Sequence, residues 1–423
     1  MRTVTTALAL LTTLAGTGIL AAWWVRHHVT LWRTFPWRMR RAMVHLGLVR
    51  RIAGRRDEKP RLVRNEPDGD AMHLAWRMPA GANTKFDGAK RELELTLDCA
   101  IRSWHADGRL HTLIGRAPIP DMHLLSEAPR AIVGALPVHL GMGRFGPINI
   151  DLAEAPHMLV GGTSGAGKTA EIESILLQLC RAKSPAELEL VLVDLKGGVD
   201  MALFVPVPHR RAPVAGNHEG AAERLTDLVA EMEARQAKIL GRATTVGEWN
   251  RIHPEDRIAY VVCVIDEFAD LLPKDAATKR ERDAREAAWA AVSTLTRMGR
   301  ASGIHLIIAT QRPDADVLQG QVKANTPIHI AFSCASDWNS IVMLGQGNTA
   351  AFRLPCLPNG KPLPGRAIFQ WAGSYETPFQ AAYMEPAEIE AEVHALRARY
   401  APHAGLSASD AELVPVLPNG EKP

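Results

Sequence analysis

The amino-acid sequence predicts an α/β protein that combines a parallel sheet, a smaller α/β domain and one membrane-spanning helix at the N-terminus. Three observations predict this class. Residues 3–24 carry no charged side chain, residues 71–135 contain short alternating segments, and beyond residue 136 short apolar runs alternate with longer amphipathic stretches. The last pattern is typical of a parallel sheet with helices on both faces. A chain of 423 residues is also long enough for a large domain plus an accessory one.

The first segment has the length and flanks of a transmembrane helix. Residues 3–24 would cross the ~30 Å hydrocarbon layer once as a helix. Trp23 and Trp24 end the segment, where aromatic side chains are favoured. Nine arginines follow between residues 26 and 56, so the positive-inside rule places the bulk of the chain on the cytoplasmic side of a cell membrane. We interpret these arginines as contacts to anionic lipid rather than as a DNA-binding arm.

Charge and cysteine content narrow the function classes. Residues 1–59 hold eleven of the 49 Lys and Arg residues but two of the 46 acidic ones, which leaves 38 basic and 44 acidic residues in the remainder. The bulk charge of that part therefore does not predict nucleic-acid binding. The five cysteines lie far apart without a C-x-x-C pair, so we expect buried free thiols in a reducing compartment.

The expected organisation follows from these patterns. Prolines and polar residues between 57 and 70 predict a linker. The five expected parts are a transmembrane anchor at 1–25, a basic juxtamembrane segment and linker at 26–70, a small α/β accessory domain at 71–135, a large α/β domain at 136–384, and a closing helix with a polar tail at 385–423.

Strands are expected where apolar residues alternate or form short runs. In the small domain they are expected at 72–78, 93–97 and 111–117. In the large domain they are expected at 157–160, 190–193, 260–265, 304–309 and 328–332. The run KRERDARE at 279–286 alternates in sign and is expected on the solvated side of a helix.

One motif carries the strongest chemical signal. Eight consecutive residues fit G-x-x-x-x-G-K-[ST]: Gly162, Thr163, Ser164, Gly165, Ala166, Gly167, Lys168 and Thr169. Such glycines let backbone N–H groups wrap around phosphate oxygens, and the following helix adds its positive N-terminal end. Lys168 would contact the β- and γ-phosphates of ATP, and the Thr169 hydroxyl would bind Mg²⁺. ATP use also disfavours a cleaved signal peptide at residues 3–24, because no ATP is available outside the cell.

An acidic pair supplies the second half of the predicted site. Residues 260–265 form an apolar strand that ends in Asp266 and Glu267. Asp266 would bind Mg²⁺, and Glu267 would lie beside the attacking water as its base. The alternative is that these two carboxylates only cap a helix.

Two further residues are candidates for roles in ATP hydrolysis. Gln311 follows the strand at 304–309, where a neighbouring strand presents a polar side chain to the γ-phosphate, and we expect it to act as a sensor. Arg297, Arg300 and Arg312 surround the same strand. We choose Arg300 as the arginine that reaches into a neighbouring subunit's site, the alternative being a surface ion pair.

Four segments, taken in order, resemble the FtsK/SpoIIIE family of DNA translocases over roughly 135–372. They are DLAEAPHMLVGGTSGAGKT (151–169), VLVDLKGGVDMALF (191–204), VVCVIDEFADLL (261–272) and GRASGIHLIIATQRPDADVLQGQVKANTPIHIAF (299–332). The resemblance implies a RecA-like P-loop motor that assembles as a homo-hexamer and threads double-stranded DNA. It would also make the 71–135 unit similar to the small domain that precedes the motor in this family.

The departures from the family narrow the expected role. The chain after residue 384 is too short for the winged-helix domain that reads chromosomal orientation sequences, and one membrane helix replaces several. The Pro/Gly-rich stretch 345–366 is longer than the usual loop, and the sequence assigns it no role. These features resemble the members that transfer plasmids or integrative elements, with transfer or secretion machinery as partners. Chromosome segregation at division and type VII secretion-like protein export remain the alternatives.

Overall fold

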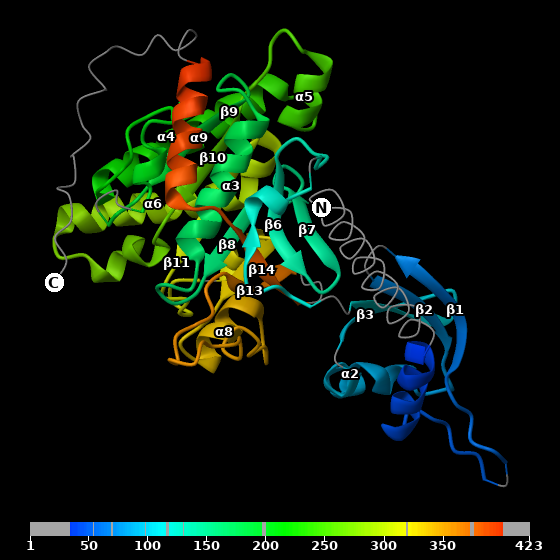
Figure 1. Ribbon diagram of the computed structural model, residues 1–423. Helices are drawn as coiled ribbons and strands as arrows, with labels where there is room; N and C mark the ends of the chain where they lie inside the picture. Colours follow the sequence, from blue (N-terminus) through cyan, green and yellow to red (C-terminus); the bar gives the residue numbers. More distant parts are fainter. Residues whose placement is uncertain are drawn as a thin grey trace, which may run out of the picture. The chain divides into compact units, whose positions relative to one another are not determined.

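The computed structural model describes residues 34–400, except 54, 69–70, 98, 116–117, 130, 197–199, 319 and 373–375. The chain divides into two compact units (Figure 1). One comprises residues up to Ile119 with the turn Gly143–Gly146, and the other comprises Pro120–Met142 and the chain from Pro147 onward. Each unit is described by itself.

The small unit is a four-stranded antiparallel sheet packed against helices. Its strands are β1 (Arg61–Asp68), β2 (Ala71–Arg77), β3 (Ala100–Ala106) and β4 (Arg109–Gly115), in the order β1-β2-β4-β3. Residues 34–45 are helical, and α2 spans Asn83–Leu97. Alternate residues of the strands point to one face and form a buried core with both helices, which includes Phe35, Met39, Leu74, Trp76 and Phe86.

Two expectations for this region are wrong. The predicted linker at 57–70 contains β1, which pairs with β2, and the helix at 34–45 buries Phe35, Met39 and Met43 in the core. Residues 93–97, predicted as a strand, are the last turns of α2. Leu93 and Leu97 are four residues apart and therefore lie on the same face of a helix as well as of a strand, so the short leucine pattern did not distinguish the two.

The large unit is built on one mixed sheet with the order β7-β6-β14-β13-β12-β8-β11-β10-β9. Five neighbouring strands are parallel: β12 (Ile328–Phe332), β8 (His157–Gly161), β11 (Ile304–Thr310), β10 (Tyr260–Ile265) and β9 (Leu188–Val193). These contain the five strands predicted for the large domain. Each is buried on both faces, which explains their nearly continuous apolar sequence.

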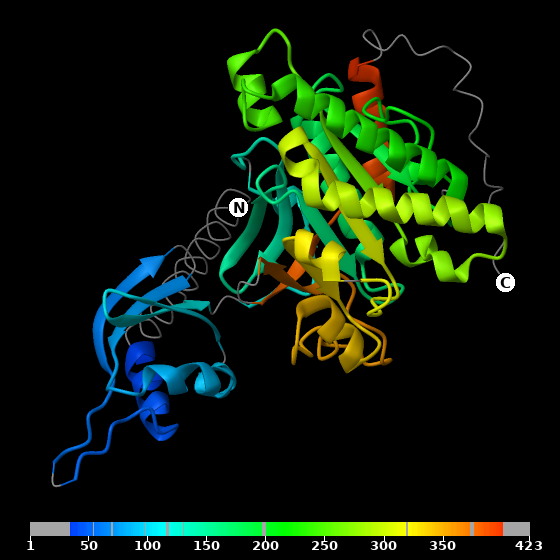
Figure 2. The same ribbon diagram turned by 180° about the vertical axis from the view of Figure 1, so that it is seen from behind.

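Helices cover both faces of the parallel strands. On one face lie α3 (Lys168–Ala182) and the closing helix α9 (Pro386–Tyr400), which share a core with alternate strand residues (Figure 1). On the other face lie α4 (His218–Ile239) and α6 (Lys279–Met298). In the reverse view of Figure 2 these two helices lie in front of the sheet. Because the five strands are parallel, their carboxyl ends lie at one edge of the sheet.

The sequence missed the antiparallel part of this sheet. β6 (Pro137–Gly143), β7 (Gly146–Asp151), β13 (Arg366–Trp371) and β14 (Thr377–Tyr383) extend it beyond β12, and the short β5 (His123–Leu124) pairs with β14. Because β5 and β6 pair within this sheet, the large unit begins at Pro120 rather than at residue 136. The remaining helices are α5 (Val246–Ile252), α7 (Gly320–Asn325) and α8 (Asp337–Leu344).

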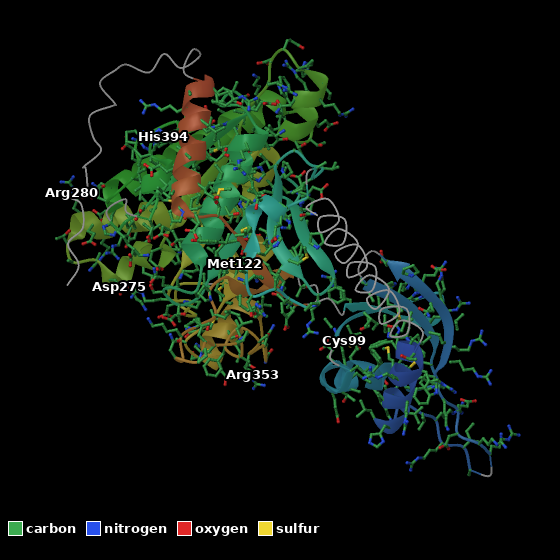
Figure 3. All side chains as sticks on the ribbon, viewed as in Figure 1. Cys99, Met122, Asp275, Arg280, Arg353 and His394 are labelled. Atoms are coloured by element: carbon green, nitrogen blue, oxygen red, sulfur yellow. The ribbon has the colours of Figure 1, made fainter. Side chains whose placement is uncertain are left out.

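Other predictions have mixed outcomes. The charged run 279–286 opens α6, where Arg280 is exposed, as Figure 3 shows, but Arg285 is buried and donates to the Leu272 carbonyl at 3.0 Å. Four cysteines are buried as expected, whereas Cys356 is exposed. No helix among residues 34–400 is long and apolar enough to cross a bilayer, and the predicted span at 3–24 lies outside the described residues, as does the tail after Tyr400.

Candidate active site

The phosphate-binding loop lies at the carboxyl end of β8, between β11 and β12. The N–H of Gly162 donates to the Thr310 carbonyl at the end of β11 (3.3 Å), and the N–H of Thr163 donates to the Ser333 carbonyl just after β12 (2.8 Å). Gly167, at φ 114°, leads directly into α3. The loop is therefore tied to both neighbouring strands and to a helix N-terminus, the arrangement that binds phosphate through backbone N–H groups.

The side chain of Lys168, the first residue of α3, points back into the phosphate-binding loop. Its Nζ donates to the carbonyls of Gly162 (2.7 Å) and Thr163 (3.0 Å), and the residue is 6% exposed. Burial lowers the pKa of this ammonium to about 8. Two backbone carbonyls therefore hold the ammonium within the predicted phosphate-binding loop.

Asp266 and Glu267 follow β10, two strands from the loop, and both are buried. The N–H of Asp266 donates to the Val193 carbonyl at the end of β9 (3.0 Å). Its carboxylate contacts Lys196, whose Nζ lies 2.9 Å from Oδ2. Burial raises the pKa of Asp266 to about 6 despite this hydrogen bond and ion pair.

Glu267 is held by the end of the neighbouring strand β11. Its Oε1 accepts from the Thr310 hydroxyl (2.7 Å), and its Oε2 accepts from the N–H of Gln311 (2.9 Å). Oε1 also accepts from the N–H of Ala269 (3.3 Å), so Glu267 does cap the short helix that follows, as the alternative interpretation of the acidic pair proposed. The same contacts fix the carboxylate between β10 and β11, at the edge where the phosphate loop lies.

The donor set of the site fits Mg²⁺. A carboxylate at Asp266 and a hydroxyl at Thr169 are the hard oxygen ligands that this ion takes, and the Lys196 ammonium already lies against that carboxylate as a cation. No group of three or more His, Cys, Asp or Glu side chains that would hold a metal occurs among the described residues.

The Pro/Gly-rich stretch 345–366 ends against the phosphate loop. The N–H of Gly365 donates to the Ala166 carbonyl (2.9 Å), and the Gly365 carbonyl accepts from Ala381 in β14 (2.8 Å). A Cβ on Gly167 would lie 2.8 Å from the Gly365 nitrogen. No role was predicted for this stretch from the sequence, and in the structure its last residues support the loop.

The two remaining predicted residues lie at opposite ends of β11. Gln311 follows its carboxyl end beside Glu267, half exposed, where a sensor side chain would have to be. Arg300 is exposed at the amino end, away from the phosphate loop of its own chain. It therefore takes no part in its own subunit's site, and a role in a neighbour's site remains a prediction. Arg312 pairs with Asp270 at 3.1 Å.

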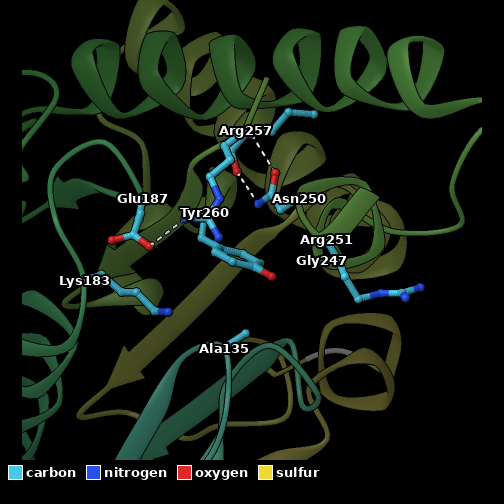
Figure 4. Close-up of a pocket in the computed structure, with 9 residues that line it drawn as sticks. Ala135, Lys183, Glu187, Gly247, Asn250, Arg251, Arg257 and Tyr260 are labelled. Atoms are coloured by element: carbon cyan, nitrogen blue, oxygen red, sulfur yellow. Dashed lines mark hydrogen bonds and ion pairs between the residues drawn. The ribbon is translucent and has the colours of Figure 1, made fainter. Parts of the chain in front are cut away.

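A separate pocket of about 280 Å³ lies at the other edge of the sheet. Tyr260, at the amino end of β10, lines it together with Lys183, Arg251 and Arg257 (Figure 4). Arg257 is paired with Glu187 at 3.2 Å. This pocket is distinct from the phosphate loop and shares none of its residues.

Sequence reasoning missed three residues of the site: Lys196, Thr310 and Gly365. Lys196 belongs to the segment DLKGG, which follows β9. A lysine just after a buried parallel strand lies at the same edge as the phosphate loop, and this position was the signal that could have identified it. Thr310 is the last residue of β11 and lies one position beyond the predicted strand 304–309. Nothing in the local sequence of Gly365 indicates its contact with residue 166.

The geometry agrees with the comparisons to known proteins. Residues 125–255 and 241–315 match the model of the FtsK/SpoIIIE family, and this region includes the phosphate loop, Lys196, the acidic pair and Thr310. Residues 125–315 carry an FtsK/SpoIIIE-family ATPase domain. The DNA translocase FtsK of Caldanaerobacter subterraneus subsp. tengcongensis is 34% identical over 281 residues, which cover 66% of this chain and 37% of the relative.

One further relative and two solved structures are also similar to this chain. The DNA translocase FtsK of Staphylococcus aureus (strain Mu50) is 32% identical over 60% of this chain, and the chain spans about a third of these curated relatives. The pCW3 conjugation coupling protein TcpA, solved with ATPγS, is similar with a TM-score of 0.58 and 27% identity, covering 85% of this chain and 98% of TcpA. The Thermomonospora curvata type VII secretion ATPase EccC has a TM-score of 0.52 at 25% identity, covering 63% of this chain and 32% of EccC.

Proposed function

We propose that this protein is a membrane-anchored motor that uses ATP and Mg²⁺ to translocate double-stranded DNA during transfer of a plasmid or integrative element. The observation that carries the proposal is the placement of Glu267. Its carboxylate is fixed by Thr310 and the N–H of Gln311 at the same sheet edge as the phosphate loop and Lys168. A base whose carboxylate is held against the end of β11, the strand next to the loop, is the arrangement that ATP hydrolysis requires.

The site performs hydrolysis by positioning and charge. The loop N–H groups and Lys168 bind the phosphates, and Lys168 neutralises charge that develops on the γ-phosphate. Mg²⁺ bound by Thr169 and Asp266 would neutralise the β- and γ-oxygens when the nucleotide is present. Glu267 orients a water and accepts its proton on a carboxylate oxygen as the water attacks. In this proposal the site is completed by Gln311 of the same subunit and by Arg300 of a neighbouring subunit.

Similarity supports DNA as the cargo. The relatives of highest identity reported above are named DNA translocases, and the similarity to the conjugation coupling protein TcpA extends over nearly the whole of that chain. Transfer of a mobile element therefore fits better than chromosome segregation. The segment 3–24 supplies the anchor, and the motor works as a homo-hexamer on the cytoplasmic side of the membrane.

The test uses the full chain in lipid nanodiscs. Duplex DNA should stimulate ATP hydrolysis, and displacement of a triplex-forming strand should report movement along the duplex. Lys168→Ala should abolish nucleotide binding, whereas Glu267→Gln should bind ATP and fail to hydrolyse it. DNA affinity should fall steeply with salt and show little sequence preference. Equal loss of ATP binding in both variants would contradict the assigned roles.

The similarity to EccC favours one second candidate, a protein-export ATPase. The two functions differ in what stimulates hydrolysis. ATP turnover that is indifferent to duplex DNA but rises with an exported polypeptide would support protein export. Size measurement of the DNA-bound particle tests the hexamer, and a particle that stays monomeric on DNA would contradict it.

A further inference from the structure

Lys196 lies among three carboxylates at the active site. Its Nζ is 2.9 Å from Asp266 Oδ2, 3.5 Å from Asp200 Oδ2 and 4.0 Å from Glu267 Oε2. The lysine side chain is 32% exposed, whereas Asp266 and Glu267 are 5% exposed. Lys196 is therefore the basic partner that lies against the buried acidic pair.

The other lysine of the site, Lys168, makes none of the described ion pairs with Asp266 or Glu267, although, against the lowering of its pKa by burial, both carboxylates raise that pKa by charge attraction. Lys168 directs its ammonium to the carbonyls of Gly162 and Thr163, within the phosphate loop. Among the described ion pairs of Asp266 and Glu267, Lys196 is the basic partner of both. Removing its charge would leave two buried carboxylates without a paired cation, which is costly.

We propose that Lys196 occupies the cation position of the nucleotide-free site and competes there with Mg²⁺, so that nucleotide entry exchanges the ammonium for the divalent ion. The inference rests on the proposed function in one respect, the assignment of Asp266 as the Mg²⁺ ligand. Lys196 is a positioning residue in this scheme, because it acts through Asp266 rather than on the reacting atoms.

The main chain at Lys196 is held by the buried side chain of Asp194. Asp194, fully buried just after β9, accepts the N–H of Lys196 on Oδ1 (3.0 Å) and the N–H of Met201 on Oδ2 (3.2 Å). The N–H of Asp194 in turn donates to the Ala215 carbonyl (3.0 Å). The main chain of Lys196 is thus anchored to the sheet, while its flexible four-carbon stem reaches the acidic pair.

The exchange has a functional consequence. Two cations cannot occupy one side of the Asp266 carboxylate, so the ammonium lowers the affinity of the empty site for Mg²⁺ alone. Nucleotide phosphates add ligands that favour Mg²⁺ and shift the competition. The site would then bind the divalent ion together with ATP rather than before it, and Asp200 would remain as a partner for the displaced ammonium.

The experiment measures Mn²⁺ binding to the full chain in nanodiscs without nucleotide or DNA, by electron paramagnetic resonance. Lys196→Met removes the charge and keeps the stem, and it should raise Mn²⁺ affinity about tenfold or more because a competing positive charge is lost. The double variant Lys196→Met/Asp266→Asn should lose this gain. Lys196→Arg should bind Mn²⁺ as weakly as the wild type, and so should the matched control Lys183→Met at the far sheet edge.

Each other outcome overturns the proposal. Unchanged Mn²⁺ affinity in Lys196→Met, or a gain that persists in the double variant, would show that the lysine does not hold the Asp266 position. Should Lys196→Met fail to fold, Lys196→Gln takes its place. A wild-type protein that already binds one Mn²⁺ tightly without nucleotide contradicts the competition regardless of any variant. Because no DNA enters this assay, failure of the DNA-translocation proposal would be seen separately, in the DNA-stimulated ATPase measurement.

Discussion

The main-chain N–H of Gly365 donates a hydrogen bond to the carbonyl of Ala166, with 2.9 Å between nitrogen and oxygen. Gly365 closes the Pro/Gly-rich stretch 345–366, and its own carbonyl accepts from Ala381 in β14. One residue thus joins the phosphate loop to the antiparallel side of the sheet. The position of the loop depends on this part of the fold as well as on β8.

Replacing Gly365 by alanine should weaken ATP binding. The residue has φ +75°, and a Cβ would lie 2.6 Å from Nε2 of Gln380, which is itself bonded to the Pro364 carbonyl at 2.8 Å. Gly360→Ala is the matched control, because Gly360 has φ +79° and open space around it. Both variants should lose about 1 kcal/mol of stability from backbone strain. Calorimetric titration should show weaker ATP affinity in Gly365→Ala alone, and equal affinities would contradict the supporting role.

Thr310→Val should slow hydrolysis without weakening ATP binding. The substitution removes the hydroxyl that donates to Glu267 Oε1 at 2.7 Å and leaves the side-chain volume nearly unchanged. With one of its donors lost, Glu267 would hold the attacking water less well, so kcat should fall about tenfold or more. Thr296→Val is the control, since this buried hydroxyl bonds to the Val292 carbonyl within α6. A similar fall of kcat in both variants would indicate a general structural effect.

The sequence predicts the phosphate loop and the acidic pair well, because each is a short contiguous pattern next to an apolar strand. Residues 162–169 and the run that ends in Glu267 need no distant partner to be recognised. The parallel strands were found for the same reason, since strands buried on both faces have nearly continuous apolar sequence. Local pattern and tertiary environment agree in these segments.

Prediction failed where tertiary contacts decide the structure. β1 is fully exposed along its length and reads as a polar linker, yet pairing with β2 makes it a strand. Lys196 and Asp266 are 70 positions apart, and only the order of β9 and β10 in the sheet brings them together. The contact of Gly365 with Ala166 likewise depends on a sheet edge that the sequence did not predict.

Arg300→Ala should spare ATP binding and strongly reduce turnover if this arginine acts on a neighbouring subunit. Arg300 is exposed at the amino end of β11, remote from its own phosphate loop, so its loss cannot disturb the local site. Arg297→Ala, also exposed and three residues away, is the control. Mixing Arg300→Ala with Lys168→Ala chains should restore part of the ATPase rate, because a mixed ring contains some sites with both residues intact. Absence of any recovery would exclude action in trans.

Two histidines are buried side by side at the amino ends of the parallel strands. Nδ1 of His157, the first residue of β8, accepts from the N–H of Leu306 (3.1 Å), and Nδ1 of His305 in β11 donates to the Pro156 carbonyl (3.2 Å). Burial lowers the pKa of His157 to about 3 and that of His305 to about 4. Both rings are therefore neutral in the folded protein throughout the physiological range.

This pair should make the protein less stable as the pH falls below 6.5. The unfolded chain binds protons on these rings near the ordinary pKa of about 6.5, whereas the folded chain does not until much lower pH, so acid favours unfolding. Between pH 7.5 and 5.5 each histidine should cost about 1.4 kcal/mol of unfolding free energy. Urea unfolding at the two pH values measures the loss. His157→Asn/His305→Asn, whose amides can replace the Nδ1 hydrogen bonds, should reduce it, whereas His394→Asn at an exposed position of α9 should not (Figure 3). An unchanged pH dependence in the double variant would mean that these rings do not stay neutral in the folded state.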